Sequence, residues 1–278
     1  MGADIAHVFA AGGWPVHVVE PSQATRASIR AAASLHATLE EVPWADVAIV
    51  VECIPEQLQP KRDTFARLVA LAPREAVLAS NSSAYPISEI ARGLETQERM
   101  AGLHFFLPAH IVPLVEVIRS ERTRPGLPEE LAELMRSLGK VPVQVRRDIP
   151  GFLANRLQHA LAREAYALID AGVATPEDID IAVRFGFGFR YLAAGPCLQR
   201  DHAGLDVHAA AAATMYPTLA SNTLVSPTLT DKVARGELGM KTGKGFFEWD
   251  ADSVAREKAR YEACLKAALE VLEKDPGR

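Results

Sequence analysis

The chain has 278 residues, of which 49% are hydrophobic and 23% are charged, and its formal net charge is −5. This is the composition of a globular protein with one large or two modest domains, and the charge gives no reason to expect nucleic acid or an anionic membrane as a partner. The three cysteines are scattered and the histidines have no ligand spacing, so we expect neither a disulfide framework nor a metal site. We find no signal peptide and no apolar run of about 18 residues, and therefore expect a cytoplasmic protein.

The first twenty residues predict part of a dinucleotide-binding unit. Residues 5–10 are typical of a helix, and residues 16–20 of a strand that ends in Glu20. In the complete motif a strand and G-x-G-x-x-G come first, and an acid about 20 residues later binds the ribose. Gly2 occupies the last glycine position and Glu20 follows it by 18 residues, so the chain starts inside the motif. We expect that the true start lies upstream, in preference to the alternative of a damaged or repurposed relative. We also expect residues 1–278 to bind a dinucleotide weakly, because the missing loop would supply N–H groups to the pyrophosphate.

The next part of the chain alternates helices and strands. A short Ala-rich helical segment is expected between residues 21 and 44, a buried strand at residues 46–52, a helix at 63–71 and a strand at 76–79. This alternation predicts an α/β fold with a doubly wound parallel sheet, Rossmann-like and without its first strand. Lys61 precedes the expected helix, where a solvated lysine at a helix start is an alternative to a functional one.

Residues 80–118 carry the candidate chemistry. A polar turn, Asn81-Ser82-Ser83, follows one strand, and the next strand ends in His104. Glu116 stands twelve residues later in an otherwise apolar run, where an unpartnered carboxylate would cost several kcal/mol to bury. A histidine held by a carboxylate with a hydroxyl nearby is a general acid/base arrangement. Taken singly, each residue could equally be structural, and the combination favours a catalytic site.

Beyond residue 148 the pattern changes. A helix at residues 128–138 and a strand at 141–145 complete the α/β part, and residues 148–151 are typical of a linker. A long helix at 152–171, a Thr175-Pro176 helix start and a final helix at 253–272 follow. We therefore predict a dinucleotide-binding domain at residues 1–148 and an all-helical domain for substrate binding and dimerisation at residues 149–278.

Several motifs in order resemble the 3-hydroxyacyl-CoA dehydrogenase family, including its lambda-crystallin and gulonate dehydrogenase branch that oxidises free hydroxy acids. They are Asn-Ser-Ser at residues 81–83, Gly-Leu-His-Phe-Phe-x-Pro at 102–108, Pro-Leu-Val-Glu-Val-Ile at 113–118 and Gly-Phe-x-x-Asn-Arg at 151–156. The likeness runs from Met1 to about Phe247. It implies an oxidoreductase that uses NAD and acts as a homodimer on a small hydroxy acid or acyl-CoA.

The resemblance also implies roles for individual residues. His104 is the expected base and Glu116 orients its ring, while Ser83 and Asn155 hold the substrate oxygen. The expected cofactor residues are Gly2, Glu20, Glu56, Lys61 and Asn81. A carboxylate at Glu20 accepts hydrogen bonds from a ribose hydroxyl and repels a 2′-phosphate, which predicts NAD in preference to NADP.

Two features bear on the substrate. Only 25 residues separate Glu20 from Asp46, too few for the helical hairpin that helps hold CoA in the acyl-CoA enzymes. Arg190 occupies a position where those enzymes tend to be apolar, and a guanidinium binds a carboxylate bidentately, although a surface arginine is an equal alternative. Leu107 replaces the usual asparagine of Phe-Phe-Asn-Pro. We therefore place a free hydroxy acid modestly ahead of a CoA thioester.

Three interpretations remain open from the sequence. The first is an NAD-dependent 3-hydroxy acid dehydrogenase. The second is a non-catalytic structural or binding relative that kept the fold, and the third is a truncated product with no stable fold. The DNA upstream of the start distinguishes them, because an in-frame strand and G-x-G would favour the enzyme.

Overall fold

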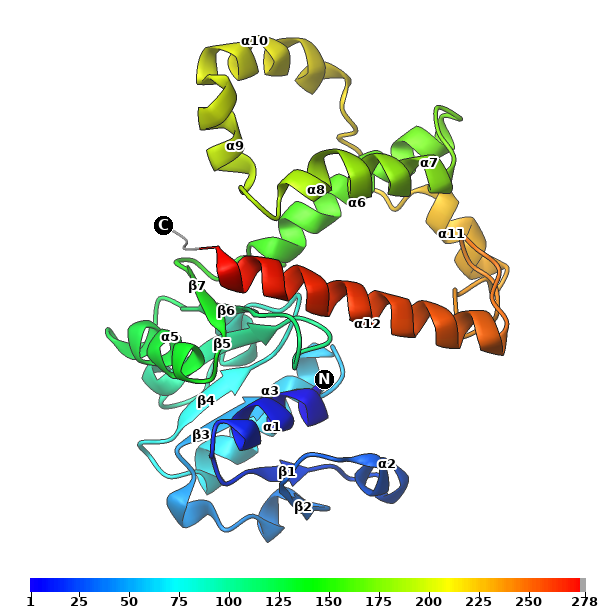
Figure 1. Cartoon of the computed structure of the whole chain (residues 1–278). Coiled ribbons are helices and arrows are strands. Elements are labelled where there is room, and N and C mark those ends of the chain that lie inside the picture. Colours follow the sequence, from blue (N-terminus) through cyan, green and yellow to red (C-terminus); the bar gives the residue numbers. More distant parts are fainter. Residues whose placement is uncertain (276–278) are drawn as a thin grey trace. The chain divides into compact units, whose positions relative to one another are not determined.

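The structure, a computed structural model, describes residues 1–275 and divides into two compact units. The first unit is Met1–Arg156, and the second begins at Leu157. Figure 1 shows the strands confined to the first unit and helices making up the second.

The first unit is built on a five-stranded sheet in the order β3-β4-β5-β6-β7. β1 (His17–Val19) and β2 (Ser34–His36) form a separate parallel pair. The strands of the main sheet are β3 (Ile49–Glu52), β4 (Val77–Ser80), β5 (Met100–Phe105), β6 (Leu114–Ile118) and β7 (Val141–Val145).

The sheet departs from the predicted all-parallel arrangement at one strand. β6 runs antiparallel to β5, whereas the other neighbouring strands are parallel. Residues 106–113 connect β5 to β6, and this connection is too short for the crossover of a dozen or more residues that a parallel partner requires. The expectation of helix between residues 21 and 44 was also incomplete, because only α2 (Gln23–Ser28) is helical before β2.

Helices cover both faces of the main sheet, and successive strand residues alternate between them. Leu78 and Met100 pack with residues of α3 (Leu58–Leu71) and α4 (Ile87–Ile90). Their neighbours Ala79 and Ala101 pack on the opposite face with residues of α1 (Gly2–Ala11) and α5 (Leu127–Ser137). Side chains of a strand alternate with a period of two, so a sheet covered on both faces reads as a continuous apolar run. Short 3-10 helices occupy Leu39–Glu41, Trp44–Asp46 and Gln97–Arg99.

The β5–β6 pair requires a glycine. Gly102 is directly opposite Ile118, and a Cβ on Gly102 would lie 3.0 Å from two side-chain atoms of Ile118. That distance is tighter than an ordinary van der Waals contact, so the missing side chain lets the two strands approach. This fixes the register that places His104 opposite Glu116 two residues further along.

The second unit is helical in its described part. Thr175 caps α7 (Pro176–Ile181) through its hydroxyl, as its sequence signature predicted. None of the helices from α6 (Ala154–Asp170) to α12 (Ala251–Lys274) contains a buried residue in the part of the chain that the structure describes. The helices are α6 (Ala154–Asp170), α7 (Pro176–Ile181), a π-helical segment (Ala182–Phe187), α8 (Gly188–Arg190), α9 (Pro196–Ala203), α10 (Leu205–Met215), a 3-10 turn (Tyr216–Thr218), α11 (Pro227–Ala234) and α12 (Ala251–Lys274).

Candidate active site

A histidine and a glutamate form a buried pair at the end of β5. His104 Nδ1 lies 2.8 Å from Glu116 Oε2, and the side chains are 3% and 0% exposed. The two residues are direct partners in the antiparallel ladder, so the backbone itself sets their distance. The structure thus brings together the two residues that the sequence paired as base and orienting carboxylate.

The second oxygen of Glu116 is also occupied. Its Oε1 accepts hydrogen bonds from the N–H groups of Leu153, at 3.0 Å, and Ala154, at 2.8 Å, where α6 begins. Burial alone would raise the pKa of Glu116, but the bond from His104 and these two N–H groups outweigh it and lower the pKa. The carboxylate is therefore ionised and accepts from Nδ1 of His104, so Nε2 is the ring nitrogen that faces the rest of the site.

Ser83 lies beside that second ring nitrogen. Its hydroxyl oxygen lies 3.1 Å from His104 Nε2, and the residue is exposed at the turn after β4. The amide of Asn155 donates to the carbonyl of Ser83 over 3.3 Å. Hydrogen bonds therefore connect all four predicted catalytic residues within the first unit, from Asn155 through Ser83 and His104 to Glu116.

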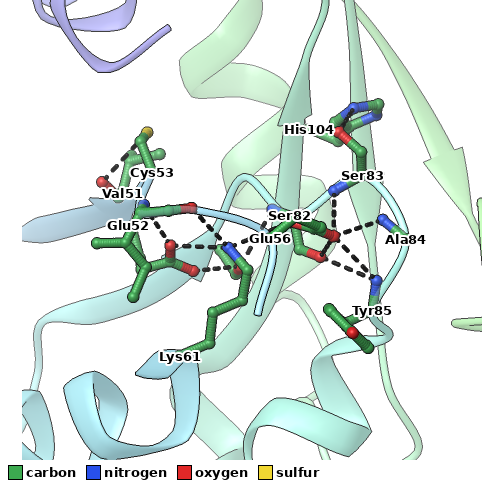
Figure 2. A network of polar contacts seen from close by, with 12 residues as sticks. Val51, Glu52, Cys53, Glu56, Lys61, Ser82, Ser83, Ala84, Tyr85 and His104 are labelled. Atoms are coloured by element: carbon green, nitrogen blue, oxygen red, sulfur yellow. Dashed lines mark hydrogen bonds and ion pairs between the residues drawn. The ribbon is translucent and has the colours of Figure 1, made fainter. Parts of the chain in front are cut away.

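Glu56 holds the turn that carries Ser83 (Figure 2). Its Oε1 accepts from the Ser82 hydroxyl at 2.6 Å and from the Ala84 N–H at 2.8 Å, with the N–H groups of Ser83 and Tyr85 at 3.2 and 3.3 Å. Burial acts to raise the pKa of Glu56, whereas these donors and Lys61 lower it overall. The turn therefore has the form of a backbone cradle for an anion, filled by a carboxylate of the same chain.

Lys61 lies behind this carboxylate. Its Nζ is 2.9 Å from Glu52 Oε1 and 3.3 Å from Glu56 Oε2, and its side chain is 1% exposed. The alternative of a solvated lysine at a helix start is therefore wrong, because α3 begins at Leu58 and turns Lys61 inward. Glu52 also accepts from the hydroxyl of Ser80, so this buried charge has several partners.

The remaining cofactor candidates lie in different settings. Glu20 follows β1, and its Oε1 accepts the N–H of Ser22 at 2.9 Å, which leaves Oε2 for a ribose hydroxyl. Arg26, the nearby cation, donates to the backbone carbonyls of Glu20 and Pro21 and so does not compensate a 2′-phosphate. These donors and acceptors fit an adenosine ribose without a phosphate.

Asn81 and Gly2 have structural contacts. The side-chain oxygen of Asn81 accepts the N–H of Phe105 at 2.8 Å, which ties the ends of β4 and β5 together. A Cβ on Gly2 would make an ordinary contact with Cys53 at 3.5 Å.

Burial raises the pKa of the Cys53 thiol to about 12, so this cysteine is a thiol at neutral pH.

Arg190 belongs to the second unit. It is exposed at the end of α8, and no ion pair is recorded for it among residues 1–275. The Arg190 guanidinium is thus available to an anionic ligand. Gly186, in the π-helical segment just before α8, has a non-helical backbone (φ −93°, ψ −112°).

Sequence reasoning missed two residues of this region. Glu52 is a buried carboxylate at the end of β3, and an acid that closes an apolar strand was a usable signal. Phe152 packs its ring 5.8 Å from that of His104. Its position just after a glycine in the linker gave no indication of this contact.

Two further findings concern possible metal ligands and membrane-spanning helices among the described residues. Residues 1–275 contain no group of three histidine, cysteine, aspartate or glutamate side chains placed to hold a metal ion. Within the same range, no helix has the length and apolarity needed to cross a membrane.

Comparison with known families identifies the chain. Residues 24–149 match the NAD-binding domain of 3-hydroxyacyl-CoA dehydrogenase, and residues 151–249 match its C-terminal domain. The chain belongs to the 3-hydroxyacyl-CoA dehydrogenase family. This confirms the family, the Rossmann-like fold with a helical second part, and NAD as the cofactor of the family's nucleotide-binding domain.

Curated relatives carry two kinds of name. The chain is 34% identical over 225 residues to 5-formyl-3-hydroxy-2-methylpyridine 4-carboxylate 5-dehydrogenase of Mesorhizobium japonicum, covering 81% of the chain and 73% of the relative. It is 33% identical to 3-hydroxyadipyl-CoA dehydrogenase of Escherichia coli, covering 92% of the chain and 58% of the relative. Human mitochondrial hydroxyacyl-coenzyme A dehydrogenase is 39% identical over 72% of the chain and 63% of its own length. The alignments with the last two thus span about three fifths of those proteins.

Solved structures agree on the fold. A crystal structure of the pyridine carboxylic acid dehydrogenase, described as an NAD⁺-dependent dismutase, superimposes with a TM-score of 0.93 at 29% identity, covering 99% of this chain and 96% of that one. FadB2 of Mycobacterium tuberculosis gives a TM-score of 0.71 at 30% identity, covering 90% of this chain and 95% of that one.

Proposed function

We propose that this protein oxidises the hydroxyl group of a 3-hydroxy acid in an NAD-dependent reaction, with His104 as the general base. The observation that carries the proposal is the state of the imidazole. Nδ1 is engaged by an ionised, fully buried carboxylate, and Nε2 faces an exposed hydroxyl at 3.1 Å. A base with one nitrogen fixed and the other turned toward a hydroxyl is arranged to exchange one proton with a ligand that binds there.

The reaction divides between the protein and its cofactor. His104 Nε2 accepts the hydroxyl proton of the substrate, and the electron pair of that O–H bond forms the new carbonyl. Glu116 stabilises the imidazolium that results, without leaving its hydrogen bonds to Leu153 and Ala154. NAD⁺ would supply the acceptor for the hydride that leaves the hydroxyl-bearing carbon of the substrate.

Ser83 and Asn155 are the proposed partners of the substrate oxygen. The Ser83 hydroxyl lies next to Nε2, so an oxygen bound there is near both groups. The bond from the Asn155 amide to the Ser83 carbonyl fixes the Asn155 side chain relative to the backbone of Ser83. Donors already placed around a developing charge stabilise it without reorganisation.

For the substrate we favour a free hydroxy acid over a CoA thioester. Residues 21–46 form α2, β2 and two short 3-10 helices, and no helical hairpin occurs in this described segment. Arg190 is exposed and suits a carboxylate. The Mesorhizobium relative is named for a substrate with a free carboxylate, whereas the Escherichia coli relative is named for a CoA thioester.

The domain assignment and the dimer are also proposals. We assign nucleotide binding to residues 1–148, and substrate binding and homodimerisation to residues 149–278. The second unit leaves many large apolar side chains exposed, including Val173 at 69%, Phe185 at 72%, Leu224 at 82% and Val225 at 64%. Apolar surface on this scale marks an interface, and a second copy of the chain would cover it symmetrically. Analytical ultracentrifugation tests the dimer, and Leu224→Asp with Val225→Asp should shift it to monomer.

The activity is tested by measuring NADH formation with a panel of free 3-hydroxy acids and with 3-hydroxybutyryl-CoA. We expect a higher kcat/KM for a free acid, and Arg190→Met should lower it, because the substrate carboxylate then loses a charge-assisted hydrogen bond worth about 1.5–3 kcal/mol. If the enzyme prefers the thioester, and Arg190→Met does not change that preference, the free-acid substrate is rejected. The proposal that the protein is a dehydrogenase would still hold. Cofactor binding without turnover on any substrate would favour the non-catalytic relative.

A further inference from the structure

The linker before α6 contains a strained residue beside the candidate dyad. Phe152 has φ +50°, in the left-handed region, and the preceding Gly151 has φ +74°. Glycine adopts this conformation readily, but it is an outlier for a bulky side chain. Such a conformation persists only where the surroundings determine it, and it is concentrated at functional sites.

The ring of Phe152 reaches one member of the dyad. The residue is 3% exposed and packs in an apolar cluster with Ile118 and Val145. Its ring centroid lies 5.8 Å from that of His104, at an interplanar angle of 56°. Phe106 makes the second aromatic contact with the imidazole, at 4.5 Å. The imidazole is thus held by two rings as well as by its hydrogen bonds.

The backbone of Phe152 reaches the other member. Its own N–H donates to the carbonyl of Ile149 at 3.0 Å, which closes a turn. The next two N–H groups, of Leu153 and Ala154, then donate to Glu116 Oε1. In the usual right-handed or extended region at Phe152 the chain would leave in another direction, and these two donors would point elsewhere.

We propose that Phe152 is a positioning residue for the His104–Glu116 pair. Its ring fixes the plane of the imidazole, and its left-handed backbone directs two N–H groups onto the carboxylate. Both effects hold Nδ1–H on Glu116 and so keep Nε2 aimed at the substrate. The inference rests on the proposed function for its catalytic consequence, but the geometry it predicts exists in the protein without substrate.

Three substitutions separate the two effects. Phe152→Ala removes the ring and leaves a side chain that the left-handed region disfavours, whereas Phe152→Gly removes the ring and accepts that region freely. Phe152→Leu keeps most of the buried volume, so it tests the loss of the ring if the alanine and glycine variants do not fold. Val145→Ala is the matched control, because it removes apolar volume from the same cluster and leaves the dyad contacts in place.

Two readouts are measured for each variant that circular dichroism shows to be folded. The first is the downfield proton resonance of a histidine Nδ1–H bonded to a carboxylate, assigned by its loss in His104→Gln and recorded on the resting protein. The second is kcat and the KM for NAD with the best substrate. We expect Phe152→Ala to weaken or shift the resonance and to lower kcat about 10–10²-fold, with the KM for NAD changed less than about 2-fold.

Phe152→Gly should fall between the wild type and Phe152→Ala, and Val145→Ala should match the wild type in both readouts. A wild-type resonance in Phe152→Ala and Phe152→Leu would overturn the proposal. An equal loss in the alanine and glycine variants would overturn the backbone contribution. If the wild type shows no dehydrogenase activity, the proposed function fails, and the resonance still decides whether Phe152 positions the pair.

Discussion

His104 and Glu116 occupy the same rung of the antiparallel ladder between β5 and β6. A direct cross-strand pair of this kind has its separation set by backbone hydrogen bonds, so the side chains need little additional ordering. The same antiparallel turn that breaks the parallel sheet therefore creates the candidate dyad. A parallel crossover after β5 would have removed Glu116 from this position.

Replacing Glu116 by glutamine should lower kcat by at least ~10²-fold. The amide keeps the shape of the side chain, but it cannot stabilise the imidazolium by charge, and it can present a donor where Nδ1–H needs an acceptor. Steady-state kinetics with separate titration of cofactor binding checks this. Glu133→Gln, at an exposed acid on α5, is the control and should keep wild-type activity. Near-normal kcat in the Glu116 variant would remove that residue from the mechanism.

Lys61→Met should destabilise the protein by about 3–5 kcal/mol, because it leaves the buried carboxylate of Glu52 without its cation. The cost is measured as the change in the free energy of unfolding by denaturant titration. Arg67→Met breaks an exposed ion pair with Glu40 and should cost less than about 1 kcal/mol. If the two substitutions lower the free energy of unfolding equally, the buried Lys61–Glu52 pair contributes no more to stability than an exposed ion pair.

The stability of the helical unit should fall in acid through Glu237. Arg235 in particular, with Lys232 and Lys244 also near, lowers its pKa from the usual 4.5 to about 2. A carboxyl whose pKa is depressed by folding stabilises the fold above its unfolded pKa, and that contribution disappears as the pH falls from 4.5 to about 2. Thermal unfolding at several pH values should show Glu237→Gln to be less stable than wild type at pH ~6, and this difference should shrink as the pH falls and vanish below pH ~2. A stability difference between wild type and Glu237→Gln that does not depend on pH would contradict this role of Glu237.

Glu20 should set the choice between NAD and NADP. Its carboxylate has an oxygen left for the ribose and would repel a 2′-phosphate, and Arg26 is bonded to backbone carbonyls. Fluorescence titration should show tighter binding of NADH than of NADPH, and Glu20→Ser should narrow the ratio about tenfold or more, mainly by weakening NADH binding. Glu41→Ser, at another acid in the first unit, should leave the ratio unchanged. Tighter NADPH binding by the wild type would refute this role.

Local sequence patterns were sufficient for most of the strands and for the dyad. The apolar runs that end at Ser80 and His104 predicted β4 and β5, and the apolar run around Glu116, which forms β6, indicated that its carboxylate required a partner. The strand β2 was not predicted, because three residues between short helices carry too little periodicity to be recognised.

Contacts made at a distance were harder to predict. The inward direction of Lys61 depends on the start of α3 and on Glu52, neither of which a local charge pattern specifies. The position of Phe152 depends on a positive φ that no sequence rule predicts for phenylalanine. The direction of β6 could have been anticipated, since the eight residues from 106 to 113 exclude a crossover helix.

The central claim is that Nε2 of His104 takes the substrate proton, and His104→Ala tests it most directly. The structure predicts that this variant binds NAD with nearly the wild-type Kd and loses at least ~10²-fold in kcat with the best hydroxy acid. His110→Ala, which alters a half-exposed histidine near Asp4, is the matched control and should retain full activity. A His104→Ala protein that keeps most of its turnover would contradict the account.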